Sequence, residues 1–192
     1  MHYNLTYAII RTPRHPGLIV VAKDRLSALD RILGSRNEIE VLSEIPGVQL
    51  AGLRYRGIFS SSSAGDAHVV HSTPDPTHRH TLQVILASHV TSDTGTGLVH
   101  CAPAHGSEDY HAFRSLLDSG MLCHVDAEGK FCSSVKDIVG PLEADLVGLE
   151  VLKEGSKAIV RLLGQTKSLL AVEKFRHRYP YDWKTDEPVI VT

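Results

Sequence analysis

The clearest structural pattern in this 192-residue sequence lies in residues 95–110, which read Gly95-Thr96-Gly97-Leu98-Val99-His100-Cys101-Ala102-Pro103-Ala104-His105-Gly106-Ser107-Glu108-Asp109-Tyr110. The glycines predict a loop, the apolar run 98–102 predicts a short strand, and Pro103 begins a second loop. Ser107 is a typical helix N-cap, and the helix predicted after it ends at Gly120. The segment therefore predicts a loop, a strand, a second loop and a helix in succession.

Outward from this unit, the flanking sequence predicts short strands and a few helices. Residues 5–10 and 18–21 are apolar runs separated by prolines and a glycine, which indicates a hairpin. Asp24 is a candidate cap for a helix that Gly34 would end. The other predicted elements are strands in 39–59, a flexible loop at 60–65, a buried strand in 81–90, a hairpin over 123–132 and one or two helices in 155–175. We therefore predict a mixed α+β fold in a single domain spanning residues 1–192.

The composition is typical of a soluble globular domain. Hydrophobic residues make up 42% of the chain, charged residues 22%, and the net charge is −2 with histidine neutral. These values exclude a disordered or collagen-like chain. No apolar stretch is long enough to predict a membrane span, and the N-terminal residues do not resemble a signal peptide. We expect no membrane partner.

Cysteine and histidine content add two expectations. Cys101, Cys123 and Cys132 are far apart and form no Cys-x-x-Cys pair, which argues against a disulfide framework or a structural zinc site and favours a reducing compartment. The chain also has twelve histidines, and protonating all of them would change the net charge from −2 to +10. We therefore expect its affinity for polyanions to rise below about pH 6.5, the ordinary pKa of histidine.

The candidate functional residues His100, His105 and Asp109 lie within ten positions of one another. Asp109 is in the first turn of the predicted helix, where the helix dipole favours an ionised carboxylate, so it could hold a small cation such as an α-ammonium group. The alternative is that Asp109 only satisfies backbone amides at the helix start. The three side chains could also form a metal site, although their spacing matches no known zinc motif.

Two other features of the segment allow a functional and a structural interpretation. Cys101, next to a histidine, could be a nucleophile, but adjacent strand residues point to opposite faces, so a small buried hydrophobe is the better interpretation. The Gly95-Thr96-Gly97 loop could let a ligand approach the backbone closely or could be a tight turn.

Residues 95–110 resemble the signature of the editing domain that is inserted in isoleucyl-, valyl- and leucyl-tRNA synthetases. His100 and the pair His105-Gly106 are most similar to the isoleucyl branch. The run Tyr179-Pro180-Tyr181-Asp182-Trp183-Lys184-Thr185 is similar to the segment by which this insertion returns to the catalytic domain in mitochondrial enzymes. The resemblance covers essentially the whole chain.

The resemblance implies a fold and an activity. The fold is that of the class I aminoacyl-tRNA synthetase editing domain, a strand-rich, barrel-like core with peripheral helices. The activity is hydrolysis of the ester of valine mischarged on tRNA(Ile). Asp109 would accept the α-ammonium group and His100 would form part of the wall that excludes isoleucine. The substrate-binding residues would be Thr96, Gly97, His105 and Gly106, and neither a metal ion nor a cofactor would be needed.

The resemblance also implies a larger context. We expect the chain to be a piece of a longer synthetase, whose catalytic domain would use ATP and Mg²⁺. The family places a threonine-rich strand upstream of the matched residues, so the isolated piece is expected to lack one wall of the editing pocket. The expected partners are the 3′ end of tRNA(Ile), valine as the mischarged amino acid and the parent catalytic domain. The mitochondrial matrix is the expected location, with the cytoplasm as the alternative. The alternative functions are a module that binds the tRNA 3′ end without hydrolysis and a metal-dependent hydrolase.

Overall fold

The computed structural model describes residues 1–34, 38–59, 81–114, 121, 123–174 and 178–191. The chain divides into two compact units, Met1–Cys101 and Ala102–Thr192, and each is described by itself. The predicted loop at 60–65 and the predicted helix end at Gly120 lie outside the described residues. That residues 1–192 form a single domain stays a prediction.

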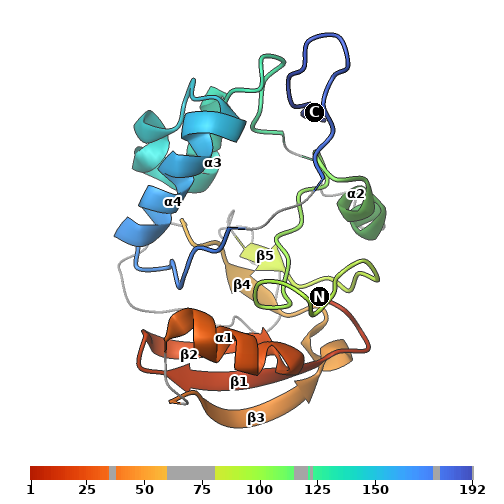
Figure 1. Ribbon diagram of the computed structural model, residues 1–192, viewed down its shortest axis with the longest axis vertical. Coiled ribbons are helices and arrows are strands. Elements are labelled where there is room, and N and C mark those ends of the chain that lie inside the picture. The colour runs from red at the N-terminus through yellow and green to blue at the C-terminus, as the bar shows by residue number, and fades with distance from the viewer. Residues whose placement is uncertain (35–37, 60–80, 115–120, 122, 175–177, 192) are drawn as a thin grey trace. The chain divides into compact units, whose positions relative to one another are not determined.

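The first unit is built on a three-stranded antiparallel sheet with the order β2-β1-β3 (Figure 1). The strands are β1 (Thr6–Thr12), β2 (His15–Ala22) and β3 (Glu40–Pro46). The predicted hairpin is confirmed, because β1 pairs with β2 from Tyr7 opposite Ala22 to Thr12 opposite His15. The central strand β1 is the most buried, since it has a neighbour on both edges and buries side chains on both faces.

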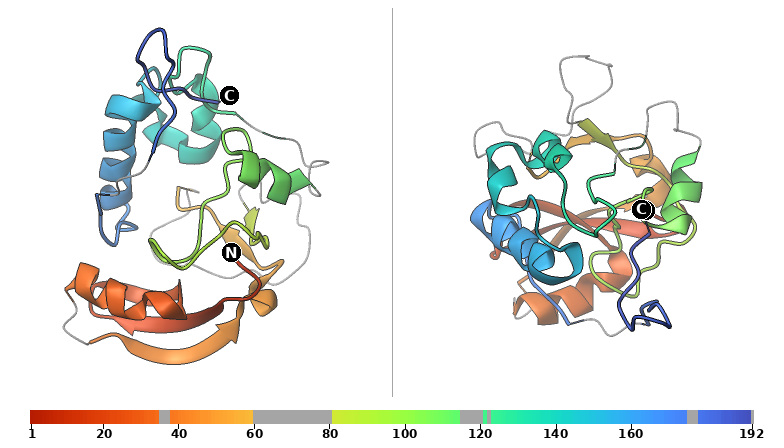
Figure 2. Two further views of the ribbon diagram at one scale, coloured as in Figure 1. Left: turned by 45° about the vertical axis from the view of Figure 1, so that its right-hand side comes forward. Right: turned by 90° about the horizontal axis from the view of Figure 1, so that it is seen from above.

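Helix α1 (Leu26–Leu33) covers one face of this sheet, as Figures 1 and 2 show. Its Leu29 packs into a cluster with Ala8 and Ile10 of β1 and Val21 of β2. The helix ends at Gly34 as predicted, because that residue has a left-handed φ of 61°, a conformation that favours glycine.

The predicted cap at Asp24 is wrong. A 3₁₀ turn, Lys23–Arg25, precedes α1 and contains this residue. The Asp24 carboxylate instead accepts a hydrogen bond from the Ser92 hydroxyl at 3.3 Å. The side chain is therefore bonded to a segment far away in the sequence rather than to the helix start.

The buried strand predicted in 81–90 is also wrong in its extent. Only β5 (Thr81–Gln83) is a strand, and it pairs with β4 (Arg54–Arg56) in a two-stranded sheet. Leu82 and Leu86 are exposed, whereas Ala87 and Val90 are buried. A fully buried strand lies inside a sheet whose two faces are covered, whereas β5 has one strand neighbour among the described residues and so lies at a sheet edge.

The second unit consists of short helices, turns and hairpins. Its helices are α2 (Ser107–Phe113), α3 (Lys136–Val139) and α4 (Ser156–Gln165), and α3 and α4 lie side by side in Figures 1 and 2. The hairpin predicted over 123–132 is confirmed by the bridge between Val125 and Phe131. The described part of the region 155–175 contains one helix, α4, which begins after a π-helical turn at Val151–Gly155.

The predicted α+β class is therefore confirmed. The barrel-like core is not seen within the described ranges, whose strands form two small open sheets. The expectation of a barrel came from the family resemblance, and no pattern of strands in this sequence supported it. In the described part of the chain, the helices are too short or too polar to cross a membrane.

Candidate functional site

The loop at 93–97 is fixed in the first unit by hydrogen bonds that its backbone carbonyls accept from the junction of β2 and α1. The Ala22 amide donates to the Thr96 carbonyl at 2.7 Å. The Arg25 guanidinium donates to two further carbonyls, from Nη1 to Asp93 at 2.7 Å and from Nε to Gly95 at 3.0 Å. Three carbonyls of the loop are thus bonded to residues about 70 positions earlier, and the loop conformation is set before any ligand arrives.

Gly97 is buried at the base of this loop. Its φ is 74°, and a Cβ at this position would collide with the Ala22 side chain. Its carbonyl accepts a hydrogen bond at 3.0 Å from the hydroxyl of Tyr7, a residue with no exposed surface. Both the backbone conformation and the close approach to β2 therefore require glycine here.

Tyr7 connects the first strand to the loop and was not a sequence-based candidate. Its hydroxyl also accepts a hydrogen bond from the His2 amide at 3.0 Å. Burial raises the pKa of the Tyr7 phenol, and the His2 amide opposes this by stabilising the phenolate. The sequence signal that could have identified Tyr7 is a general one. A tyrosine in a buried strand needs a polar partner for its hydroxyl.

The strand predicted at 98–102 is absent, since the described backbone there has an irregular conformation. The Leu98 amide donates to the Thr96 hydroxyl at 3.4 Å rather than to a neighbouring strand. Leu98 still packs against the core cluster that contains Tyr7, but Val99 and His100 are exposed. Cys101 is half-buried, in agreement with a small residue at the edge of a core.

Asp109 is held against the turn that precedes α2 in the second unit. Its Oδ2 atom accepts a hydrogen bond from the Ala102 amide at 2.9 Å, and the side chain is half-buried. The Ala102 carbonyl accepts from the amides of His105 at 2.9 Å and Gly106 at 3.0 Å, which closes the turn. Asp109 therefore does satisfy a backbone amide, that of Ala102, which lies before the helix.

Gly106 lies directly beside this carboxylate. A Cβ at position 106 would stand 3.3 Å from Asp109 Oδ2, a closer approach than most side chains tolerate. Gly106 is also the residue that precedes α2, so the predicted Ser107 cap is wrong. The Ser107 hydroxyl instead donates to the Glu108 carboxylate at 3.0 Å.

The backbone amides of Gly97 and Gly106 already have acceptors. Gly97 donates to the Thr94 carbonyl at 3.3 Å and Gly106 to the Ala102 carbonyl at 3.0 Å. A negatively charged oxygen at either position would have to compete with these bonds. The two glycines are therefore shaped for close approach rather than for anion binding.

His105 is half-buried and both of its ring nitrogens have neighbours. Its Nδ1 atom lies 2.6 Å from the Val191 carbonyl oxygen, and its Nε2 atom lies 3.9 Å from Cys123 Sγ. The described ranges contain no group of three or more His, Cys, Asp and Glu side chains that could hold a metal ion. We propose no metal site.

The six predicted site residues fall on both sides of the division between the units. Thr96, Gly97 and His100 lie in the first unit, and His105, Gly106 and Asp109 lie in the second. Within the first unit, the structure brings the loop together with Tyr7 and Arg25. Within the second, it brings Asp109 together with the turn at 102–106. The role of these residues in substrate binding or catalysis stays a prediction.

Comparison with known proteins gives a consistent set of relatives. No family model matches the chain. It is 33% identical over 188 residues, 98% of its length, to an isoleucine–tRNA ligase of Acaryochloris marina. It is 35% identical over 185 residues to the mitochondrial isoleucine–tRNA ligase of Macaca fascicularis and 34% identical over 186 residues to that of Gallus gallus, in each case over 96% of the chain. The chain spans 16% of the length of each of these three relatives.

Proposed function

We propose, from the homology of nearly this entire chain to a segment of isoleucine–tRNA ligases, that it is the editing domain of such an enzyme. Its reaction would be hydrolysis of the ester that joins valine to the 3′-terminal adenosine of tRNA(Ile). The proposal includes the class I editing-domain fold. It is supported by the loop and turn within residues 93–109, which hold small residues and the Asp109 carboxylate in defined positions.

The need for a second site follows from the size of the free energies. Valine lacks one methylene group of isoleucine, and an apolar pocket gains only about 1–3 kcal/mol from such a group, an estimate for which isoleucyl-tRNA synthetases are themselves the standard example. A separate hydrolytic site can admit valine and exclude isoleucine by steric overlap. His100, whose side chain is exposed, is the residue that we propose for the wall that meets the larger amino acid.

The observation that carries the proposal is the fixed orientation of the Asp109 carboxylate. The Ala102 amide donates a hydrogen bond to Oδ2 at 2.9 Å. Because residue 106 is glycine, no Cβ atom crowds this carboxylate from that position. An ammonium group is a strong donor to such a carboxylate, and this contact would fix the adjacent ester carbonyl for attack by water. We assign Asp109 to the α-ammonium group and the residues Thr96, Gly97, His105 and Gly106 to the surroundings of the substrate.

The proposed context is that of a complete ligase. tRNA(Ile) and the parent catalytic domain, where ATP and Mg²⁺ act, would be its partners. The mitochondrial matrix is the proposed location, supported by the mitochondrial relatives and by the run at 179–185, with the cytoplasm as the alternative because bacterial ligases match as well.

The test separates the charge of Asp109 from its structural bond. Asp109→Asn keeps an oxygen that can accept the Ala102 amide but loses the negative charge, whereas Asp109→Ala loses both. The matched control is Glu108→Ala, which removes the neighbouring exposed carboxylate. The measurement is the rate of deacylation of valyl-tRNA(Ile) by the full-length ligase that contains this chain.

We expect Asp109→Asn and Asp109→Ala to slow deacylation alike, by about 10- to 150-fold, which corresponds to a charged hydrogen bond of about 1.5–3 kcal/mol. Glu108→Ala should keep the original rate. If Asp109→Asn retains full activity while Asp109→Ala does not, the carboxylate is structural and its assignment to the ammonium group is wrong. If the unaltered ligase binds valyl-tRNA(Ile) but releases no valine, the domain is a binding module and not a hydrolase.

A further inference from the structure

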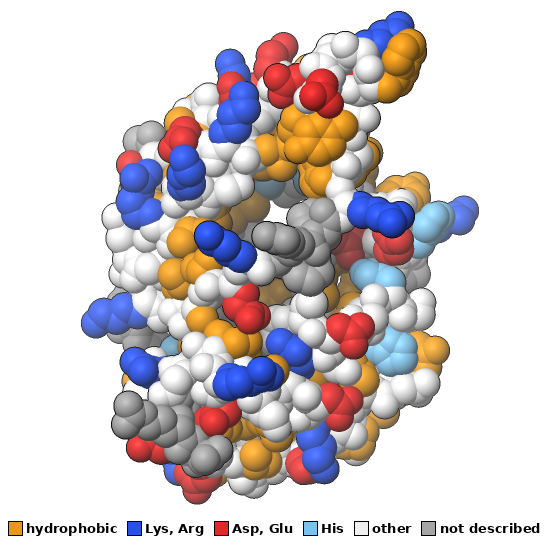
Figure 3. All heavy atoms as spheres, viewed as in Figure 1, with side chains coloured by type: hydrophobic (Ala, Val, Ile, Leu, Met, Phe, Trp, Pro, Cys, Tyr) orange, Lys and Arg blue, Asp and Glu red, His pale blue; other side chains and the backbone are white. Residues whose placement is uncertain are grey.

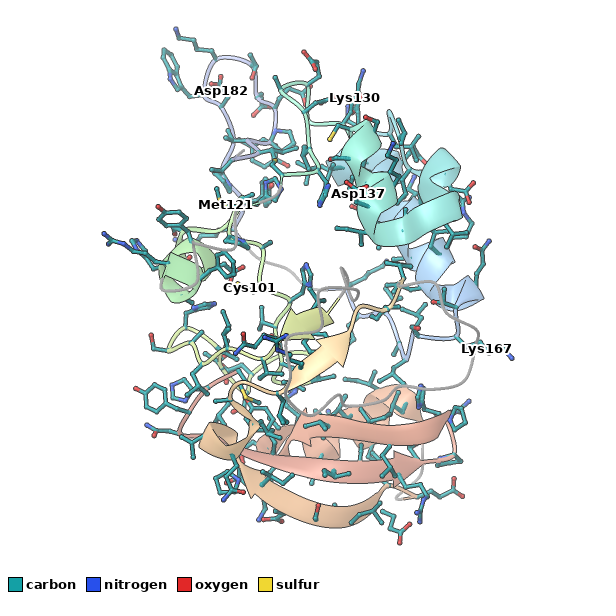
Figure 4. All side chains as sticks on the ribbon, turned by 180° about the vertical axis from the view of Figure 1, so that it is seen from behind. Cys101, Met121, Lys130, Asp137, Lys167 and Asp182 are labelled. Atoms are coloured by element: carbon teal, nitrogen blue, oxygen red, sulfur yellow. The ribbon has the colours of Figure 1, made fainter. Side chains whose placement is uncertain are left out.

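Cys123 lies at the start of a hairpin in the second unit, and its side chain is exposed. The hairpin is held by hydrogen bonds from the Asp126 amide to the Lys130 carbonyl at 2.9 Å and from the Cys132 amide to the His124 carbonyl at 3.0 Å. Figure 4 labels Met121, shortly before Cys123, and Lys130 in the returning arm of the same hairpin. The sulfur therefore sits on a fixed backbone and is accessible from solvent.

A histidine faces this sulfur in the tautomer that a base requires. The Val191 carbonyl can only accept, so the contact of 2.6 Å with His105 Nδ1 places the proton of a neutral ring on that nitrogen. The other nitrogen, Nε2, then carries the lone pair and lies 3.9 Å from Cys123 Sγ. A thiol, a histidine and a group that orients the histidine form the arrangement by which proteins activate a nucleophile.

We infer that Cys123 is an oxidative modification site, a thiol that His105 deprotonates and that peroxides convert to a sulfenic acid. In the resting thiol, the S–H group can donate to the Val125 carbonyl, which is 3.2 Å from the sulfur. A small movement of the proton from that carbonyl toward Nε2 generates the thiolate. The inference does not depend on the editing function proposed above.

The reaction balances with peroxide as the only co-reactant. The thiol proton passes to His105 Nε2, and the thiolate sulfur attacks one peroxide oxygen, so that an S–O bond forms and the O–O bond breaks. The departing hydroxide takes the proton back from the imidazolium and leaves as water. The sulfur loses two electrons, and one peroxide molecule becomes one water molecule and the hydroxyl of the sulfenic acid.

The other cysteines of the chain have different surroundings. Cys132 Sγ lies 3.0 Å from the Ser134 hydroxyl, a neutral group, and Cys101 is half-buried. His124, the histidine next to Cys123 in sequence, has its Nδ1 atom 2.8 Å from the same serine hydroxyl. Among the described residues, the charges of Asp137 and His105 act on His124, and the Cys132 sulfur lies 4.0 Å from the Cys123 carbonyl oxygen.

The sequence makes each thiol separately measurable. Trypsin cleavage after arginine and lysine leaves Cys101 in peptide 80–114, Cys123 in 115–130 and Cys132 in 131–136. We would treat the full-length protein with iodoacetamide at several pH values and follow each peptide by mass spectrometry. The test variant is His105→Asn, whose amide can still donate to the Val191 carbonyl but offers no base. The matched control is His111→Asn, an exposed histidine on α2.

We expect Cys123 in the unaltered protein to react about tenfold faster than Cys132 at neutral pH, because the neighbouring His105 can accept the thiol proton during the reaction. His105→Asn should slow the reaction of Cys123. In that variant, Cys123 should react only as fast as Cys132. The rate of Cys132 itself should not increase, and this unchanged rate shows that the hairpin is still folded. Peroxide followed by dimedone should label peptide 115–130 in the unaltered protein and in His111→Asn, but not in His105→Asn. Equal Cys123 rates in the unaltered protein and His105→Asn would overturn the inference.

Discussion

Tyr7 and Gly97 show how a site loop can depend on residues 90 positions apart. The tyrosine hydroxyl bonds the Gly97 carbonyl and the His2 amide, and its ring has no exposed surface. A buried donor and acceptor pair of this kind stabilises little by its own formation, but leaving either partner unpaired is costly. The Tyr7 hydroxyl therefore contributes to the position of the loop together with the bonds from Ala22 and Arg25.

Tyr7→Phe is expected to lower the free energy of unfolding by about 1–3 kcal/mol, because it leaves the Gly97 carbonyl and the His2 amide without their buried partner. Urea unfolding followed by circular dichroism measures this. Tyr3→Phe, at a residue that is 44% exposed, is the control and should have almost no effect. Equal losses in the two variants would show that the Tyr7 hydroxyl does not bear on stability.

Gly97→Ala and Gly95→Ala form a matched pair for the loop backbone. Both glycines have positive φ, of 74° and 55°, so each substitution should cost about 1–2 kcal/mol from the left-handed conformation. The space around them differs, because a Cβ at 97 collides with Ala22 and a Cβ at 95 meets no atom within 4 Å among the described residues. We expect Gly97→Ala to lower the melting temperature clearly more than Gly95→Ala, and equal shifts would contradict the close approach to Ala22.

At the scale of elements, the hairpin over 123–132 carries a histidine with a perturbed titration. Burial lowers the pKa of His124, and the charge of Asp137 opposes that shift. The Ser134 hydroxyl lies 2.8 Å from His124 Nδ1 and joins the ring to the segment after the hairpin. Protonation of this ring therefore works against the packing of the hairpin.

The sign of the pH dependence follows from this depressed value. The unfolded chain takes up the His124 proton near pH 6.5, the ordinary value, and the folded chain only at a lower pH. The contribution of His124 to stability is thus complete above about pH 6.5 and falls as the pH decreases from there. We expect His124→Gln to flatten this part of the curve of unfolding free energy against pH, measured by urea unfolding. The exposed His111→Gln should leave the curve unchanged, and a similar flattening in both variants would contradict the assignment.

Local signals predicted several elements correctly, and tertiary contacts explain the ones they missed. Prolines and a glycine between apolar runs predicted the β1–β2 hairpin, and Gly34 predicted the end of α1, because turns and helix ends depend on the residues within them. The strands expected in 81–90 and 98–102 required a neighbour along the edge, and apolar content alone does not supply one. Periodicity therefore recognised apolar runs but not their pairing.

The candidate site shows the same difference between local signals, which the sequence contains, and tertiary contacts, which it does not reveal. The place of Asp109 at the start of α2 followed from the sequence, since Gly106 and the helix pattern are adjacent to it. Its Ala102 partner and the contacts of Gly97 with Tyr7 and Ala22 did not, because they depend on how distant segments pack.

For the whole molecule, the charge is nearly balanced and spread out. In Figure 3, lysine and arginine side chains alternate with aspartate and glutamate over the described part of the visible face. Ion pairs between exposed residues, such as Arg11 with Glu40 at 2.7 Å and Lys23 with Glu44 at 2.8 Å, occupy some of these charges. Strong binding of a polyanion at neutral pH would therefore have to come from a partner domain, and protonation of histidines can add to it only at lower pH.

Protonation of the histidines is the route that the composition offers. The chain has twelve histidines, and protonating all of them would change the net charge from −2 to +10. We expect the protein to be retained on immobilised heparin at pH 5.5 and to need more salt for elution than at pH 7.5. The same gradient on a positively charged resin should show weaker retention at pH 5.5. An unchanged elution position on heparin would show that the histidines do not govern binding of polyanions.

The bond from the Ala22 amide to the Thr96 carbonyl has a consequence for how the loop opens. Ala22 is the last residue of β2 and is buried, so its proton is shielded from solvent as long as the loop stays in place. The rate at which that one proton exchanges for deuterium would therefore report how often the loop opens. The exchange rates of amide protons in the middle of β1 would report the slower opening of the entire sheet. A single nuclear magnetic resonance signal could in this way distinguish a loop that leaves alone from one that leaves only when the first unit unfolds.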